Sequence, residues 1–300
     1  MASLYTHQSE NVRKTFLLMT GFLVFIIALG WAFSQALAAP EIIYIAVAIA
    51  IIMNVLAYWS SDKIAIALSG AKHVSREEQP ELYRIVETLS ITAGLPLPKI
   101  HIIDAPQINA FATGRDAAHA AVAVTTGALA RLERSELEGV LAHELSHIGN
   151  RDILVSTVVV VLAGIIALMS DFFLRSLRFG GNRRGKGGGI FLIIALVAAI
   201  LAPIAATLIR LAISRQREFL ADASGALLTR YPEGLASALT KISADSEAMP
   251  RAHTGTAHLY ISNPFGPSAR AGKAGKTLVK LFQTHPPLEE RIQRLRAGVQ

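Results

Sequence analysis

Four long apolar runs restrict what this chain can fold into more than any other feature. The runs cover residues 16–37, 42–59, 153–174 and 190–213. Their only charged residues are Asp171 and Arg210, near the ends of the third and fourth runs. A helix crosses the hydrocarbon core of a bilayer with about 20 apolar residues. We therefore predict an integral membrane protein with four apolar helices.

Composition supports a membrane protein and indicates its partners. Of the residues, 52% are hydrophobic and 17% are charged, whereas soluble domains carry about 25% charged residues. The formal charge of +7 is spread over short stretches beside the apolar runs and a basic tail, with no aromatic-basic motif. This pattern favours contact with the lipid bilayer and no nucleic acid as a partner.

The runs divide the chain into four parts. We predict an N-terminal transmembrane hairpin at 1–61, a first soluble part at 62–152, a second hairpin at 153–213 and a second soluble part at 214–300. The first run is read as a retained anchor rather than a signal peptide, because a second apolar run follows it closely. The basic, glycine-rich linker at 175–189 is read as a flexible turn between two helices.

The soluble parts contain patterns of both helix and strand. Short strands are predicted at 99–104, 109–113 and 120–125, so the mainly α-helical fold includes a small β-sheet. Further helices are predicted at 77–93, 232–247 and 287–297, and the Gly-, Ser- and Pro-rich stretch 250–276 as a mobile loop.

A candidate metal site lies just before the third run. Ser135 and Glu138 match a capping box that would begin a helix carrying His143 and His147. Four residues apart, the two imidazoles project from one helix face and can reach one zinc ion. Because the chain has no cysteine, its metal ligands must be histidines and carboxylates.

Glu144 follows the first histidine directly. It could act as general base, taking a proton from a water that zinc has made more acidic and passing it to the leaving amine. The alternative is a pair of surface histidines on an amphipathic helix, since the H-E-x-x-H pattern also arises by chance.

A catalytic zinc needs a third protein ligand. Glu218 and Asp222, after the fourth run, are the best candidates: one can ligate while the other accepts a hydrogen bond from a ligating histidine. Runs three and four, folded as an antiparallel hairpin, would return Glu218 to the histidines. Alternatively, Arg217 and these acids only anchor a helix end among lipid headgroups.

Several motifs in order resemble one known family. They are AGLPLPKIHIIDAPQINAFATGR, LEGVLAHELSHIGNRDIL, SRQREFLAD and THPPLEERI, spread over residues 62–294. The chain is similar to the HtpX-like membrane zinc metalloproteases, a heat-shock peptidase family related to the CAAX prenyl proteases. One departure is Ile108, where the family often has proline. The four apolar runs match the HtpX-like branch rather than the prenyl proteases, which have more spans.

The resemblance implies a zinc-dependent endopeptidase with one Zn²⁺ per chain. It implies His143, His147 and Glu218 as ligands, Glu144 as the catalytic base and Asp222 as a supporting carboxylate. It also implies polypeptide substrates, in particular misfolded or damaged membrane proteins, and a role in the stress response at the cell inner membrane.

Two further elements follow from the resemblance. Asn109, Ala110, Phe111 and Ala112 would form an edge strand that pairs with an extended substrate; alternatively this segment is a loop that packs Phe111 into the core. His285 could stabilise the oxyanion at the scissile carbonyl or simply stand at a helix start. The remaining histidines are read as surface or packing residues, at positions 7, 73, 101, 119, 253 and 258.

Charge placement predicts the orientation. Arg13, Lys14, Lys63 and Lys72 flank the first hairpin, whereas its loop at 38–41 has no positive charge, so the soluble parts should face the cytoplasm. The basic linker conflicts with this rule, which leaves open whether the second hairpin crosses fully.

Other functions have less support. A non-catalytic zinc-binding scaffold would not need Glu144, and a transporter would need intramembrane charged pairs that the runs lack. The oligomeric state, a homo-oligomer included, stays open.

Overall fold

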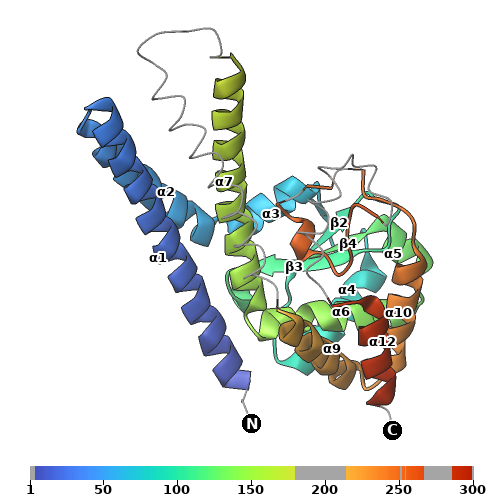
Figure 1. The fold of residues 1–300 in the computed structure, drawn as a ribbon. Coiled ribbons are helices and arrows are strands. Elements are labelled where there is room, and N and C mark those ends of the chain that lie inside the picture. Colours follow the sequence, from blue (N-terminus) through green and yellow to red (C-terminus); the bar gives the residue numbers. More distant parts are fainter. Residues whose placement is uncertain (1–3, 180–213, 251, 254, 267–285, 299–300) are drawn as a thin grey trace.

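An apolar helical hairpin and a mixed α/β domain make up the computed structural model, which describes residues 4–179, 214–250, 252–253, 255–266 and 286–298 (Figure 1). Helices dominate, and one four-stranded sheet lies among them. The predicted mainly α-helical fold with a small β-sheet is confirmed, and two described helices are long and apolar enough to cross a membrane.

The N-terminal hairpin consists of α1 (Leu4–Leu37) and α2 (Glu41–Trp59). Both helices are long and apolar enough to cross a membrane. Gly30 of α1 lies so close to Ala46 of α2 that a Cβ on the glycine would collide with it. Small residues of this kind let membrane helices approach closely. Large apolar side chains such as Trp31 and Ile45 point outward, as expected of a lipid-facing surface.

The third apolar run lies within α7 (Asp152–Phe179). Within the part of α7 whose side chains the structure describes, residues 152–166, the helix forms a further candidate span, or a re-entrant loop, together with α6 (Arg134–Gly149), from which it is bent by 83°. Leu154 and Val158 of α7 pack against Phe22 of α1. The fourth run and residues 180–189 of the linker lie outside the described residues, so two of the four predicted apolar spans are confirmed within the described part.

The sheet contains four strands in the order β1-β2-β4-β3. They are β1 (Lys72–His73), β2 (Lys99–Ile103), β3 (Ala110–Gly114) and β4 (Ala120–Thr125). Strands β2 and β4 run parallel, whereas β3 pairs with β4 antiparallel and forms an outer edge. The three strands expected from the sequence are present within about one residue of their predicted bounds.

Helices cover the sheet and enclose one main core. Their bounds are α3 (Ser61–Ser69), α4 (Pro80–Ala93), α5 (Thr126–Arg131), α9 (Arg215–Thr229), α10 (Pro232–Ala244) and α12 (Leu288–Ala297), with 3-10 turns η1 (Ala117–His119) and η2 (Ala257–Leu259). Leu82 of α4, Leu141 of α6 and Leu239 of α10 are buried in one cluster with Val122 of β4. Burying these side chains contributes about 1.5–3 kcal/mol each, as an upper bound. Helix α6 therefore runs through the centre of the domain (Figure 1).

Two local predictions were wrong. Helix α6 begins at Arg134, and its capping pair is Glu133 and Glu136, not Ser135 and Glu138: the Glu133 N–H donates to Glu136 at 2.8 Å. The cause is tertiary, because Lys241 of α10 holds the same carboxylate at 2.7 Å. The expected mobile loop at 250–276 is wrong for residues 255–261, which are buried against the domain, whereas residues 251, 254 and 267–276 lie outside the described residues.

Candidate metal centre

Helix α6 places two imidazoles on one buried face. His143 is 1% exposed and Glu144 is 2% exposed. The Nε2 atoms of His143 and His147 lie 3.2 Å apart, and the rings meet edge to face. The four-residue spacing on a helix produces this arrangement.

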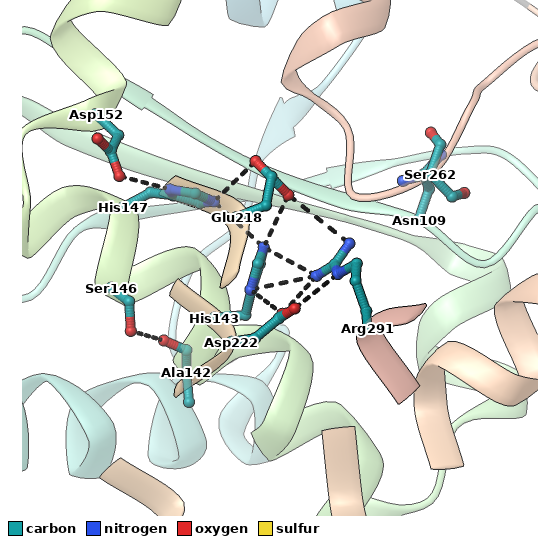
Figure 2. Close-up of polar contacts among 10 residues, drawn as sticks. All are labelled: Asn109, Ala142, His143, Ser146, His147, Asp152, Glu218, Asp222, Ser262 and Arg291. Carbon is teal, nitrogen blue, oxygen red and sulfur yellow. Dashed lines mark hydrogen bonds and ion pairs between the residues drawn. The ribbon is translucent and has the colours of Figure 1, made fainter. Parts of the chain in front are cut away.

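Helix α9 adds a carboxylate to the pair (Figure 2). The oxygens of Glu218 lie 3.8 Å from Nε2 of His143 and 3.7 Å from Nε2 of His147. One donor atom from each of the three residues falls within 4.8 Å of the others. The helices approach this closely because Gly225 of α9 faces the backbone of α6. A Cβ at this position would lie 2.9 Å from the backbone nitrogen of His143.

Each imidazole also contacts a second carboxylate through its Nδ1 atom. The Nδ1 atom of His143 lies 2.9 Å from Asp222, and the Nδ1 atom of His147 lies 3.0 Å from Asp152. If each Nδ1–H donates to its carboxylate, the Nε2 lone pairs are left for a cation. Two Nε2 atoms on one tetrahedral zinc would lie about 3.3 Å apart. The residues present therefore fit a divalent metal.

Arg291 of α12 completes the cluster and was missed by the sequence reasoning. Its side chain is 0% exposed, and its Nε and Nη2 donate to the two oxygens of Asp222 at 2.8 and 2.7 Å. Its Nη1 lies 3.7 Å from Glu218. Such a bidentate pair fixes a carboxylate in position and orientation. The only signal in the sequence was its position inside the THPPLEERI motif.

Burial and charge shift the pKa values in the cluster. Burial raises the pKa of Glu144, more than the nearby histidines lower it. Burial would lower the pKa of His147, but the bond to Asp152 and the charge of Glu218 raise it to about 9. Burial would raise the pKa of Asp222, but Arg291 and His143 lower it to about 2. His147 would therefore have to release a proton before it could bind a metal cation.

A cleft opens beside the donor atoms. The residues that line it include Ala112 of β3, Ile153 and Ser156 of α7, and His258, Leu259 and Ile261 around η2. The backbone of Ala112 lies near the carboxylate of Glu144 and lowers its pKa slightly. His258 was expected to be an ordinary packing residue, but it lies in the wall of this cleft with Nε2 3.2 Å from the Ser156 carbonyl oxygen.

The four residues of the predicted substrate strand do not all face the cleft. Asn109 precedes β3, and its side-chain amide bonds the Ser262 backbone, away from the histidines (Figure 2). Phe111 is fully buried against Tyr260. Only Ala112 of the predicted segment lines the cleft. His285 lies outside the described residues.

A membrane hairpin joined to a domain with a buried His-His-Glu set, an adjacent carboxylate and a cleft defines the class of a membrane-anchored metallopeptidase. Comparisons with known proteins agree. The model of Peptidase family M48 matches residues 76–299. The chain therefore belongs to Peptidase family M48 and is a membrane metalloprotease.

Its relatives include proteins named Protease HtpX homolog, which confirms the resemblance. The one from Thermoanaerobacter pseudethanolicus is 48% identical over 305 residues and covers 98% of each chain. The one from Pyrococcus furiosus is 51% identical over 255 residues, covering 84% of this chain and 85% of the relative. The crystal structure of S. mikatae Ste24p shares the fold, with a TM-score of 0.50 and 18% identity over 97% of this chain and 67% of that one.

Proposed function

We propose that this protein is a zinc-dependent endopeptidase that cleaves misfolded or damaged membrane proteins at the cytoplasmic face. The observation that carries the proposal is the convergence of His143, His147 and Glu218 donors within 4.8 Å, beside the buried carboxylate of Glu144. A structural zinc site would need no such carboxylate and would fill all four positions with protein ligands.

His143, His147 and Glu218 would hold the zinc, with Asp222 behind His143. A bound divalent metal supplies a positive charge that polarises the scissile carbonyl and acidifies water near neutral pH. Glu144 then accepts a proton from the attacking water and returns it to the leaving amine. Its raised pKa suits this work, since a general base is most effective when its pKa lies near the working pH.

An extended substrate would add to the outer edge of β3. Main-chain groups of alternate residues face that edge. Those of Ala110 and Gly114 already have partners, because the Ala110 oxygen accepts the Ile261 N–H and the Gly114 N–H donates to Thr157. Ala112 lies between them in the cleft; its backbone also contacts the Glu144 carboxylate, so its carbonyl oxygen would be the group that accepts a substrate N–H. We propose that substrate main chain pairs there, which places few demands on side chains.

Asn109, Ala110 and Phe111 would shape this subsite rather than contact the scissile bond. His285 is proposed to stabilise the oxyanion, as the family resemblance implies.

The orientation is proposed from charge. The positive residues flanking α1 and α2 would place the protease domain in the cytoplasm of a cell whose inner membrane holds the hairpin. Because the chain has no cysteine, one exposed position such as Glu78 can be changed to cysteine and probed in intact cells. Labelling by a membrane-impermeant reagent would refute the cytoplasmic placement.

The catalytic role is tested by Glu144→Gln in detergent-purified protein. We expect cleavage of a disordered test polypeptide to fall by about 10²- to 10⁴-fold while zinc content stays equimolar. The matched control is Glu138→Gln, which changes a partly exposed acid on the same helix that pairs with Arg134; this variant should cleave normally. Normal cleavage by Glu144→Gln would reject Glu144 as the general base, whereas zinc binding by a wild-type protein that cleaves nothing would favour a zinc-binding scaffold. Loss of wild-type cleavage with a chelator, and its return with zinc, completes the test.

A further inference from the structure

The polar start of α1 contacts the corner between α6 and α7. Asn11 precedes the first apolar run, yet only 3% of it is exposed. Its side-chain nitrogen lies 3.0 Å from the carbonyl oxygen of Asn150 and 2.7 Å from Oδ1 of Asp152. Both partners are acceptors, so the amide NH₂ group must face them. One side chain of α1 thus bridges the end of α6 and the start of α7.

Asp152 is the carboxylate behind His147. Its Oδ2 lies 3.0 Å from Nδ1 of His147, whereas its Oδ1 receives the Asn11 amide. A carboxylate rotates about its bond to Cβ, so fixing one oxygen fixes the direction of the other. Within the described part of the chain, Arg217 brings a charged group near Oδ1, but its Nη1 lies 3.8 Å away, beyond hydrogen-bond distance. The amide of Asn11 therefore provides the short contact that sets this rotation.

We propose that Asn11 is a positioning residue of the metal centre: through Asp152 it orients His147, so that the first membrane helix is part of the active site as well as an anchor. This inference rests on the proposed zinc site. The amide is neutral, so it orients the carboxylate without cancelling the negative charge that makes the imidazole a better ligand. The hairpin and the metal centre are thereby coupled across the α6–α7 corner.

The α1 helix also offers a matched control. Gln8 lies on the same helix and donates to the carbonyl oxygen of Gly149 at 2.6 Å. It thus bonds the same end of α6, but it does not contact Asp152. Replacing Gln8 removes a similar contact between helices and leaves the chain of bonds to His147 intact.

The test compares Asn11→Leu with Gln8→Met in the full-length, detergent-purified protein. Zinc affinity is measured by competition with a chromogenic chelator. Residues behind metal ligands change affinity or activity by about 10- to 100-fold. We expect Asn11→Leu to weaken zinc binding about tenfold, at the low end because it acts through Asp152, and Gln8→Met to bind zinc as the wild type does. The smaller change Asn11→Ser, in case the leucine disturbs packing, should also bind zinc more weakly than Gln8→Met.

A double variant separates positioning from general destabilisation. In an Asp152→Asn background, Asn11→Leu should cause no further loss of zinc affinity, because both changes break one chain of bonds. Additive losses, or zinc binding by Asn11→Leu and Asn11→Ser equal to that of Gln8→Met, would overturn the inference. Failure of the wild-type protein to bind zinc would instead reject the proposed metal site itself.

Discussion

Replacing Arg291 by methionine should destabilise the protease domain strongly. The guanidinium is fully buried and bonds both oxygens of Asp222. At about 1.4 kcal/mol per pKa unit, the fall of the Asp222 pKa from 3.8 to about 2 corresponds to about 2 kcal/mol. Removing one partner of a buried pair costs about 3–5 kcal/mol, because the other charge is left uncompensated. We expect a loss between about 2 and 5 kcal/mol.

The assay is urea unfolding of metal-free protein in detergent, followed by circular dichroism. Chelator is present because bound metal would stabilise the folded state by itself. With a urea dependence of about 1–3 kcal/mol per molar, the midpoint should fall by roughly 1 M or more. The control is Arg296→Met, on the same helix as Arg291. It removes an exposed ion pair to Glu233 of α10 and should hardly change the midpoint.

Two further arms test the electrostatic cause. Arg291→Met combined with Asp222→Asn should recover part of the loss, since the buried negative charge of Asp222 is removed with its partner. The folded-state pKa of Asp222 is depressed, so its contribution is present above about pH 4 and is lost as pH falls towards 2. The gap between wild type and Arg291→Met should narrow over that interval. A midpoint for Arg291→Met equal to that of Arg296→Met would refute the reasoning.

Three other predictions concern the same domain. Because His147 must release a proton to bind metal and its pKa is about 9, zinc affinity should rise by up to about tenfold per pH unit from pH 6 to 8; calorimetry with a flat profile would contradict this. Gly225→Ala, whose Cβ would lie 2.9 Å from the backbone nitrogen of His143, should separate α9 from α6, lower stability by about 1–3 kcal/mol and weaken zinc binding. Gly164→Ala, whose Cβ would meet no neighbouring atom within 4 Å in the described part of the chain, should change neither quantity. Asp245→Asn removes a carboxylate that accepts the Ile108 N–H at 2.7 Å and pairs with Arg131. Burial would raise the pKa of Asp245, but these bonds lower it, so the ionised carboxylate stabilises the fold. The variant should lose about 2 kcal/mol of stability in urea unfolding at pH 7, and this loss should vanish in acid.

Local patterns allowed much of the fold to be predicted. The apolar hairpin follows from two uninterrupted runs, and the end of α4 at Gly94 follows from the left-handed conformation that glycine adopts there. The start of α6 could not be chosen correctly from the sequence. Two overlapping patterns compete there, and Lys241 of α10, distant in sequence, favours Glu136.

The sequence by itself determined that two imidazoles, with Glu144 next to the first of them, share one helix, because the helical repeat fixes their spacing. It also narrowed the third ligand to Glu218 or Asp222. The tertiary structure decided how these two acids divide: Glu218 faces both Nε2 atoms and Asp222 faces Nδ1 of His143.

Only the tertiary structure brought in Arg291 and Asn11, which contact the carboxylates behind the proposed metal ligands. Arg291 is 69 residues from Asp222, and Asn11 is 141 residues from Asp152. Nothing in the local pattern of α12 or α1 requires these contacts. They exist because a buried charge must be compensated, and the donors that can do so come from whichever helices the fold packs against it.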